Sequence, residues 1–415
     1  MTFSQELEWR GFINQTTYKN LTELDKKLVT FYHGYDASDD SLTVGNLAAV
    51  MMDKCFMRHG HKPVILAGGA TSLIGDPGGK DGERALKPAD TIRSNIEAVK
   101  KQIQILLGAD ISLVNNLDWY QDMTVMEFLR NIGKHFSMTP LVQRDYIAKR
   151  MGHDGVGISY TEFSYTILQG YDFLHLYRKY GATLQLAGSD QWGNSLSGVD
   201  LIRRVEGQEA NVLTCPLIIN KATGKKFGKS EDGAIWLDPK KTSPFKFYQF
   251  WLNVDDEGVE GHLKVFTELN KQQIDDAIDK FKKDPSGRLA QKILAYEITK
   301  LVHGKQTADN QVKIAQTMYQ TQDFNTLNQE DFSALEQELP FAEVSEGQSY
   351  LDALVSTGLV SSKSEGRRLI EQGAINSNNL LKIETSEQQI SRADCISGYI
   401  VLLKGKKHLG LVKVN

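Results

Sequence analysis

Residues 225–230, which read Lys-Lys-Phe-Gly-Lys-Ser, bring ammonium groups, a glycine and a hydroxyl together. A nucleotide-binding P-loop needs Gly, four residues and then Gly-Lys-Ser/Thr, but Gly224 leaves only three residues before Gly228. Gly233 and Pro239 then follow where a P-loop would open a continuous helix. Two interpretations remain: a solvated basic hairpin, or a mobile loop whose lysines meet phosphate charge that develops in a transition state.

A second group of polar residues lies in a segment with helical periodicity. Tyr165, Gln169 and Asp172 are spaced i, i+4 and i+7, so they share one stripe of the helix. Three isolated polar residues usually form a solvent-facing surface. The apolar residues around them, among them Ile167 and Phe173, leave little room for such a surface. Because buried polar groups are costly without partners, the pattern favours a polar pocket.

Three further segments are polar and rich in glycine: 32–47, 68–80 and 188–194. In the first, Gly34 and Gly45 permit the close approach of a flat ring, and the helix that begins there favours anions; simple N-capping is the alternative. In the third, Asp190 is suited to bind ribose hydroxyls. Neither 68–80 nor 188–194 contains Gly-x-Gly-x-x-Gly, which argues against a nicotinamide or flavin enzyme.

The elements that position these residues alternate along the chain. We expect strands at 28–32, 63–67, 111–114 and 183–187, and helices at 47–59, 91–107 and 163–180. This order predicts a parallel sheet with helices on both faces. Ligands bind beyond the carboxyl ends of the strands in such sheets. The polar segments fall at those ends.

The second half of the chain has a different pattern. Residues 244–318 are almost wholly helical in pattern, which predicts a separate bundle. The tail begins with a helical pattern at 351–355 and ends with strands at 399–403 and 408–414.

Length and composition agree with two or three soluble domains, since the chain has 415 residues, 40% of them hydrophobic. No apolar run approaches the roughly 20 residues of a membrane helix, and the acidic N-terminus lacks a signal-peptide pattern. Cys55, Cys215 and Cys395 are far apart and have no metal-ligand spacing. We therefore expect no protein metal site and a reducing cytoplasm.

The net charge of −4 is unevenly distributed. Residues 322–346 contain seven acidic side chains and no basic ones, whereas 347–415 contain nine Lys/Arg against six Asp/Glu. A basic terminal module after an acidic connector suggests a polyanionic partner; an ordinary solvated surface is the alternative.

Taken together, these motifs resemble the bacterial-type tyrosyl-tRNA synthetases, which are class I aminoacyl-tRNA synthetases. The resemblance covers essentially the whole chain and is strong at 32–47, 68–80, 161–173, 188–194 and 226–230. It implies an α/β fold in which a Rossmann-type parallel-sheet catalytic domain with a dimerisation insertion (1–240) precedes a helical anticodon-binding domain (241–325). An acidic linker (326–346) and a small α+β RNA-binding domain (347–415) would follow.

The resemblance also implies the reaction and its partners. Tyrosine and ATP would form tyrosyl-adenylate and pyrophosphate, Mg²⁺ would accompany ATP, and tyrosine would then pass to the terminal ribose of tRNA. Family members are homodimers, and residues near 128–146 would form the interface here. No general base is needed, because the tyrosine carboxylate is already a nucleophile.

By the same resemblance, particular residues contact each part of the substrates. Tyr32 and Asp172 would bind the phenolic hydroxyl, and Tyr165, Asp76 and Gln169 the ammonium group, with Gln191 near the carboxylate or α-phosphate. The nucleotide would lie against His33, Gly34, Asp36, Gly45, Asn46, Gly188 and Asp190. The departing pyrophosphate would be stabilised by Ser38, Thr43, Lys80, Arg84, Lys226, Lys229 and Ser230.

Two departures from the family pattern accompany the resemblance. The His-Ile-Gly-His signature stands here as Thr43-Val44-Gly45-Asn46, in which threonine reaches phosphate less easily than histidine. The Lys-Met-Ser-Lys-Ser signature is Lys226-Phe227-Gly228-Lys229-Ser230 and keeps both lysines. The alternatives are a tryptophan-charging enzyme, an RNA-binding or RNA-splicing protein on a synthetase scaffold, and, least favoured, a P-loop ATPase.

Overall fold

The computed structural model describes residues 1–76, 87–108, 111–143, 145–152, 155, 157–219, 227–230, 233–378, 381–405 and 408–415, with the backbone alone at 140, 145, 146, 229 and 230. The chain divides into two units. One comprises Met1–Lys241 and Val254–Leu294, and the other Thr242–Asn253 and Ala295–Asn415. Each unit has its own sheet and its own hydrophobic core.

The first unit is built on a six-stranded sheet in the order β1-β6-β5-β2-β3-β4. Its strands are β1 (Gln15–Thr16), β2 (Thr30–Tyr35), β3 (Lys62–Ala67), β4 (Ser112–Asn115), β5 (Ala182–Gly188) and β6 (Asn211–Cys215). β1 pairs antiparallel with β6, and the other neighbours pair in parallel. The predicted parallel sheet is confirmed, while β1 and β6 are strands that the sequence pattern did not predict.

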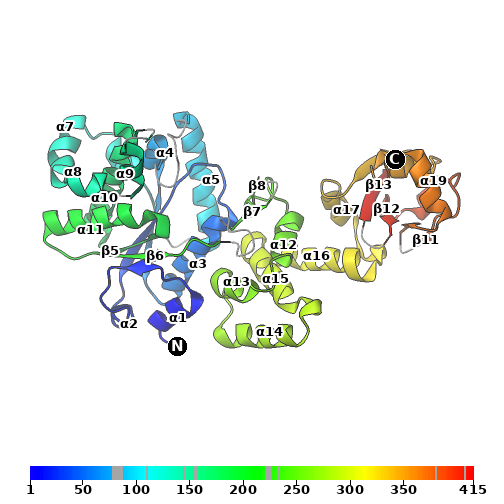
Figure 1. The fold of residues 1–415 in the computed structure, drawn as a ribbon, viewed down its shortest axis with the longest axis horizontal. Helices are drawn as coiled ribbons and strands as arrows, with labels where there is room; N and C mark the ends of the chain where they lie inside the picture. The colour runs from blue at the N-terminus through cyan, green and yellow to red at the C-terminus, as the bar shows by residue number, and fades with distance from the viewer. Residues whose placement is uncertain are drawn as a thin grey trace. The chain divides into compact units, whose positions relative to one another are not determined.

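Helices cover both faces of this sheet (Figure 1). The helices of the unit are α1 (Phe3–Arg10), α2 (Glu23–Lys26), α3 (Val44–Arg58), α4 (Gly69–Ile74), α5 (Ala89–Leu107), α6 (Leu117–Tyr120), α7 (Val125–Glu127), α8 (Met138–Val142), α9 (Asp145–Met151), α10 (Tyr160–Tyr180), α11 (Trp192–Glu206), α13 (Val259–Phe266) and α14 (Lys271–Lys283). On one face, Tyr32 of β2 packs against Phe173 of α10, with ring centroids 5.0 Å apart. On the other, Phe31 packs against Phe56 of α3. Alternate residues of β2 therefore face opposite layers, as the pleat of a strand requires.

Local sequence signals set the limits of the longest of these helices. α10 begins where the Ser159 side chain accepts a hydrogen bond from the Glu162 amide, and it ends at Gly181, whose φ is 67°. A hydroxyl at the N-cap and a left-handed glycine after the last turn are favourable at these positions. The predicted helix at 163–180 is thus confirmed and extends one turn further toward the N-terminus.

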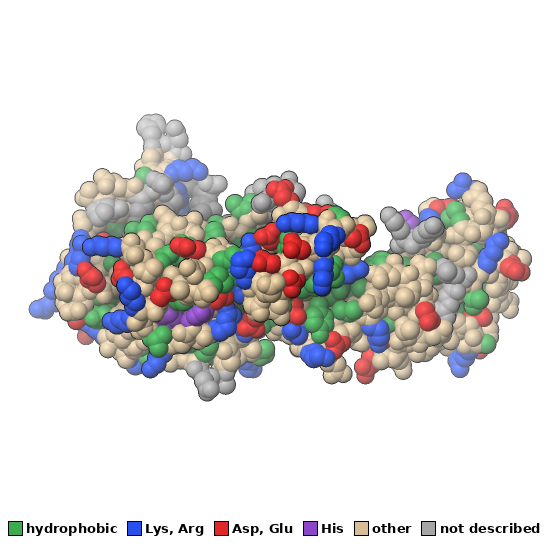
Figure 2. Space-filling model, turned by 90° about the horizontal axis from the view of Figure 1, so that it is seen from below, with side chains coloured by type: hydrophobic (Ala, Val, Ile, Leu, Met, Phe, Trp, Pro, Cys, Tyr) green, Lys and Arg blue, Asp and Glu red, His purple; other side chains and the backbone are tan. Residues whose placement is uncertain are grey.

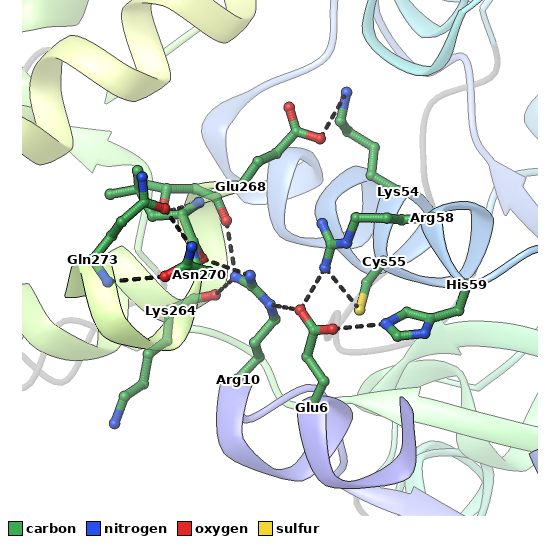
Figure 3. A network of polar contacts seen from close by, with 12 residues as sticks. Glu6, Arg10, Lys54, Cys55, Arg58, His59, Lys264, Glu268, Asn270 and Gln273 are labelled. Atoms are coloured by element: carbon green, nitrogen blue, oxygen red, sulfur yellow. Dashed lines mark hydrogen bonds and ion pairs between the residues drawn. The ribbon is translucent and has the colours of Figure 1, made fainter. Parts of the chain in front are cut away.

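A buried carboxylate joins the N-terminal helix to the rest of the first unit (Figure 3). Glu6 of α1 accepts hydrogen bonds from Arg10 (2.7 Å), from Arg58 of α3 (2.5 Å) and from His59 (2.7 Å). Arg10 also donates to the backbone oxygens of Lys264, Thr267 and Leu269. Burial acts to raise the pKa of Glu6, but the hydrogen bonds from His59 and Arg10 and the charges of the two arginines outweigh it and lower that pKa.

The same group places three potential metal ligands together, since atoms of Glu6, Cys55 and His59 lie within 4.8 Å of one another. Two guanidinium groups already lie on Glu6. Burial raises the pKa of the Cys55 thiol to about 12, which opposes the thiolate that a metal requires. We therefore interpret this group as an ion-pair network that joins α1 to α3.

The second unit combines helices with a five-stranded sheet in the order β11-β10-β12-β13-β9. Its elements are α12 (Pro244–Leu252), α15 (Leu289–His303, shared with the first unit), α16 (Lys305–Gln316), α17 (Gln329–Leu335), β9 (Phe341–Val344), α18 (Tyr350–Ser356), α19 (Lys363–Glu371), β10 (Ile375–Ser377), β11 (Leu381–Lys382), β12 (Tyr399–Lys404) and β13 (His408–Val414). The predicted helices within 244–318 and the terminal strands are confirmed. The separate bundle expected there is not, because residues 254–294 belong to the first unit.

Residues 326–346, which we expected as an acidic linker, carry regular structure. α17 places Phe332 and Leu335 in a hydrophobic cluster with Tyr399 and Leu411, and β9 pairs in parallel with β13. The acidic side chains alternate with apolar ones, and the apolar side chains are what fold the segment onto the sheet. Counting charges alone overlooks that alternation.

The surface seen in Figure 2 carries mixed charge. Acidic and basic side chains are interspersed within each part of the chain on that face, in keeping with the net charge of −4. No helix among the described residues combines the length and apolar character needed to cross a membrane.

Candidate active site

A cavity of about 170 Å³ lies at the carboxyl ends of β2 and β5, beside α4 and α10. One ordered water needs only about 10–15 Å³, so the cavity has room for a larger ligand. Nine predicted site residues line it: Tyr32, His33, Gly34, Asp36, Tyr165, Gln169, Asp172, Gly188 and Gln191. The stripe predicted on α10 therefore faces a cavity and not bulk solvent.

Asp172 is held at one end of the cavity by neutral donors. Trp119 of α6 donates to its Oδ1 at 2.9 Å, and Asn116 donates to its Oδ2 at 3.1 Å. Asp172 is 1% exposed. Burial raises the pKa of this carboxyl to about 7, although the hydrogen bonds from Asn116 and Trp119 act to lower it. Because each of its oxygens accepts one of these hydrogen bonds and has a second lone pair, Asp172 can accept a further hydrogen bond from a ligand.

Three polar atoms at the cavity have no protein partner among the residues described. They are the hydroxyl of Tyr32, Oε1 of Gln169 and Oε1 of Gln185. A buried polar group left unsatisfied costs about 1–3 kcal/mol, so three in one cavity indicate a polar ligand that supplies the missing hydrogen bonds. Burial and the nearby Asp172 raise the pKa of Tyr32 well above its usual value, so its hydroxyl stays protonated.

A second polar group surrounds the Tyr165 hydroxyl. Tyr165 donates to Oδ2 of Asp36 at 3.3 Å, and Thr71 donates to Oδ1 of Asp36 at 3.4 Å. Burial, followed by the charges of Asp36 and Asp76, raises the pKa of Tyr165 well above its usual value. Carboxylates at this end of the cavity create a negative potential suited to a cation.

Asp76 does not line the cavity but acts on a residue that does. Gln191 donates to Oδ2 of Asp76 at 2.6 Å, and its own Oε1 accepts from Asn194 at 3.1 Å. Thr166 of α10 donates in turn to Oδ1 of Asn194 at 2.7 Å. This chain of hydrogen bonds fixes the amide of Gln191 at the cavity wall.

The two signature segments contact each other near the N-terminus of α3. The amide of Val44 donates to the Ile235 oxygen at 2.9 Å, and that of Ile235 donates to the Gly228 oxygen at 2.9 Å. Gly228 has a φ of +89°, and a Cβ there would lie 3.0 Å from the Gly45 nitrogen. A residue without a side chain is therefore required where the segments meet. Phe227 also stacks on His262 of α13, with ring centroids 4.4 Å apart.

Several predicted residues lie outside the cavity lining. Thr43 and Asn46 cap α3: the Thr43 amide and hydroxyl both donate to Oδ1 of Asn46 at 2.9 Å. Ser38 accepts a hydrogen bond from Lys87 through its backbone oxygen. Gly45 is in the first turn of α3, and Asp190 lies just beyond β5. Lys80, Arg84 and Lys226 are outside the described residues, and only the backbones of Lys229 and Ser230 are described, as the short strand β7 (Lys229–Ser230) paired with β8 (Gly233–Ala234).

Several residues of the site were missed from the sequence, among them four that supply polar contacts. Gln185 and Thr71 line the cavity, while Asn116 and Trp119 hold Asp172. Gln185 could have been found in the sequence as an amide side chain inside an otherwise apolar core strand. Asn116 and Trp119 could have been found because they follow directly after a predicted strand, and ligand-binding residues of parallel sheets lie at such positions.

Known proteins resemble this chain over its whole length. Residues 24–320 match the family described as "tRNA synthetases class I (W and Y)", and residues 331–412 match the "Tyrosine--tRNA ligase SYY-like C-terminal domain". The chain is 42% identical over 425 residues to a Bacillus cereus protein named Tyrosine–tRNA ligase 2, with 100% of both chains covered. It is also 42% identical to a Bacteroides fragilis protein named Tyrosine–tRNA ligase, with 99% of both covered.

Solved structures extend the comparison. A C-terminally truncated mitochondrial tyrosyl-tRNA synthetase from Aspergillus nidulans has a TM-score of 0.69 and 29% identity, covering 77% of this chain and 94% of that one. A tryptophanyl-tRNA synthetase from Encephalitozoon cuniculi, at 14% identity and a TM-score of 0.55, shares the fold over 74% of this chain and 88% of its own. From its full-length relatives, the chain belongs to the tyrosine–tRNA ligase family of class I tRNA synthetases.

Proposed function

We propose that this protein is a tyrosine–tRNA ligase that activates L-tyrosine with ATP and transfers it to the 3′-terminal ribose of tRNA(Tyr). The observation that carries the proposal is a pair of polar side chains that border the cavity. The Tyr32 hydroxyl has no hydrogen-bond partner among the described residues, and the Asp172 carboxylate accepts hydrogen bonds from two neutral donors. Both side chains line the cavity. A phenolic hydroxyl can accept from one and donate to the other.

The same pair argues against the other aromatic amino acids. An indole nitrogen is a donor only, so it would satisfy Asp172 and leave the Tyr32 hydroxyl without a donor–acceptor partner. A phenyl ring would satisfy neither group. Tyrosine is the aromatic side chain that completes both hydrogen bonds, and this favours it over tryptophan.

The other end of the cavity suits the charged part of an amino acid. The unpartnered Gln169 and Gln185 oxygens are acceptors for an ammonium group, and Tyr165, Asp36 and Asp76 add hydroxyl and carboxylate groups nearby. We assign the ammonium to Gln169, Tyr165 and Asp76, with Gln185 as a further acceptor. Gln191 then lies near the carboxylate or α-phosphate.

The reaction that we propose needs no protein base. An oxygen of the tyrosine carboxylate attacks the α-phosphorus of ATP, the bond to the bridging oxygen breaks, and pyrophosphate leaves with its electron pair. We assign the nucleotide to His33, Gly34, Asp36, Gly45, Asn46, Gly188 and Asp190. Lys226 and Lys229 would meet the developing phosphate charge, with Ser38, Thr43, Lys80, Arg84 and Ser230, and Mg²⁺ would arrive as part of MgATP.

Other parts of the chain would serve tRNA and assembly. We assign the anticodon contact to residues 241–325 and a further RNA contact to residues 347–415. A homodimer through residues near 128–146 is supported by apolar side chains that are exposed in the single chain, including Leu129 (44%) and Met138 (58%). A monomeric mass in solution would contradict it. A reducing cytoplasm is our proposal from the three separated cysteines, which are free in the structure.

The test is amino-acid-dependent ATP–pyrophosphate exchange, measured separately with tyrosine, tryptophan and phenylalanine, followed by charging of tRNA(Tyr). We expect exchange with tyrosine at least 100-fold above the other two. Exchange with tryptophan instead would support the tryptophan-charging alternative. Absence of exchange with all three, from a folded protein, would support an RNA-binding role on a synthetase scaffold.

A further inference from the structure

A buried carboxylate on α3 binds the side of β2 that faces away from α10. Residues 33 and 35 alternate with Tyr32 and Gly34, so His33 and Tyr35 point toward α3. Nδ1 of His33 is 2.7 Å from Oδ1 of Asp53, and the Tyr35 hydroxyl donates to Oδ2 at 2.6 Å. Asp53 is 0% exposed. Both of its oxygens are thus occupied by side chains of one strand.

This arrangement fixes the imidazole of His33. A carboxylate accepts hydrogen bonds, so Nδ1 of His33 carries the proton in the contact with Asp53. Nε2 is then the ring nitrogen left for another partner, and no described residue makes a hydrogen bond to it. His33 also lines the cavity, although it is only 4% exposed. In a neutral ring with its proton on Nδ1, Nε2 is an acceptor, and it belongs to a residue that lines the cavity.

The surroundings of Asp53 leave His33 and Tyr35 as its partners. Burial raises the pKa of the neighbouring Cys215 thiol to about 12, and the charge of Asp53 adds to the effect, so the thiol stays neutral. Burial and Asp53 likewise raise the pKa of Tyr35 well above its usual value, which keeps its hydroxyl a donor. A buried carboxylate is costly unless hydrogen-bonded, and these two donors supply the hydrogen bonds.

The first signature segment, residues 43–46, lacks the histidines of the family pattern, so the imidazole of His33 has more weight as a candidate nucleotide contact. Thr43 and Asn46 stand where the family pattern has histidines, and Oδ1 of Asn46 is already occupied by the Thr43 amide and hydroxyl. The described residues that line the cavity include one imidazole, that of His33.

We propose that Asp53 is a positioning residue, which holds His33 so that Nε2 accepts a hydrogen bond from a ribose hydroxyl of the bound nucleotide. The inference rests on the proposed function for the identity of the nucleotide. It adds a residue on α3, with no contact to substrate, that acts through His33. Tyr35 shares the role by occupying the second oxygen of Asp53.

Kinetics with nucleotide analogues test this proposal. Tyrosine-dependent exchange is measured with ATP, 2′-deoxy-ATP and 3′-deoxy-ATP in the wild type, Asp53→Asn, His33→Asn and the control Met52→Leu. Met52 is buried on α3 next to Asp53, and this substitution conserves volume. We expect both test variants to raise KM for ATP about ten-fold, as the loss of one hydrogen bond predicts, and the KM for tyrosine to stay the same.

The analogues separate positioning from a general structural effect. With the deoxy analogue that lacks the contacted hydroxyl, the wild type and both variants should have the same KM within about two-fold, because the lost hydrogen bond is already absent. An equal loss with ATP and both analogues, or no loss with ATP, would overturn the proposal. If Asp53→Asn does not fold, His33→Asn carries the same prediction, since it leaves Asp53 in place.

A spectroscopic measurement distinguishes this proposal from the proposed function. Nitrogen-15 spectra of the histidine rings should show His33 with its proton on Nδ1 in the wild type, and a mixture of tautomers in Asp53→Ala. A wild type with the proton on Nε2 would overturn the positioning role. A wild type without exchange but with the proton on Nδ1 would reject the proposed function and leave the Asp53–His33 geometry supported.

Discussion

Glu6 and Asp172 are two buried carboxylates of the same unit with opposite surroundings. Glu6 is bound by two arginines and a histidine, and its pKa is lowered. Asp172 is bound by an amide and an indole, both neutral, and burial raises its pKa to about 7. The charge of Glu6 is neutralised within the protein, whereas Asp172 has hydrogen-bond donors but no ion-pair partner among the described residues. The difference separates a carboxylate that holds helices together from one that, in the proposed function, accepts a hydrogen bond from the substrate.

The largest expected effect follows from replacing the unneutralised carboxylate. In Asp172→Asn, an NH2 group replaces one carboxylate oxygen and faces the donor of either Asn116 or Trp119. The variant loses a hydrogen bond to a charged group and leaves one donor unpaired. Together these two changes cost about 3 to 4 kcal/mol. We expect kcat/KM for tyrosine in the exchange assay to fall by two to three orders of magnitude.

The matched control is Asp200→Asn on α11, where the carboxylate side chain is 55% exposed and binds Arg203. It should keep wild-type kinetics. An Asp172→Asn variant that discriminates tyrosine from phenylalanine as well as the wild type would remove Asp172 from the site.

A somewhat smaller effect, on stability, is expected at the neutralised carboxylate. Glu6→Gln leaves Arg10 and Arg58 without their counter-charge, and breaking a buried pair costs about 3 kcal/mol. We expect the free energy of unfolding in urea to fall by about 2 to 3 kcal/mol, while KM for tyrosine stays unchanged. Glu8→Gln, an exposed glutamate of the same helix, is the control and should unfold like the wild type. Equal stability of both variants would mean that the Glu6 network does not stabilise the unit.

The pH dependence of stability should differ in sign between the two carboxylates. The raised pKa of Asp172 gives stability that is present below the unfolded pKa and is lost as pH rises toward about 7. The lowered pKa of Glu6 gives stability that is present above pH 4.5 and is lost below it. Of these two carboxylates, only Asp172 should therefore contribute a slope between pH 5 and 8.

Thermal unfolding of the ligand-free protein measures this contrast. Asp172→Asn should gain about 2 to 3 kcal/mol relative to the wild type on going from pH 5 to pH 8, since the slope acts over about two pH units, which corresponds to a few degrees in Tm. Glu6→Gln should show no such gain. Parallel Tm curves for the wild type and Asp172→Asn would show that Asp172 ionises normally in the folded protein.

The smallest effect is expected at Tyr32, the neutral partner of Asp172. Tyr32→Phe removes a buried hydroxyl without a protein partner, so the ligand-free protein should gain up to about 1 kcal/mol of stability. Tyrosine binding should weaken about three- to ten-fold, because one neutral hydrogen bond is lost. Urea unfolding and tyrosine KM measure the two changes. A loss in both would indicate that the hydroxyl has a partner within the protein.

The sequence was sufficient for the parts of the fold that rest on local periodicity. Alternating apolar runs and helical spacing predicted β2, α3, β3, α5, β4, α10 and β5 in order. β1, with two residues, carries no pattern of its own and exists through its pairing with β6. Such non-local pairing leaves little trace in a short segment.

In the candidate site, too, the residues that could be predicted share one local element, whereas the others are brought together by non-local contacts. Tyr165, Gln169 and Asp172 could be predicted because they share one helix and therefore one face. The partners of Asp172 come from residues 116 and 119, and the partners of Asp53 come from a neighbouring strand. Asp53 also follows Met51 and Met52 in an apolar stretch, where a single carboxylate does not reveal what it faces. Only the folded sheet brings these groups together.

The parallel pairing of β9 with β13 has a consequence for synthesis of the chain. All six strands of the first sheet precede residue 216, so that sheet can form while the rest of the chain is still being translated. β9 begins at Phe341 but must wait for residues 408–414 before its edge is paired. Since domains fold in the order of synthesis, the C-terminal sheet should be the last to become resistant to protease on the ribosome, and a stalled chain ending near residue 400 would present an open strand edge.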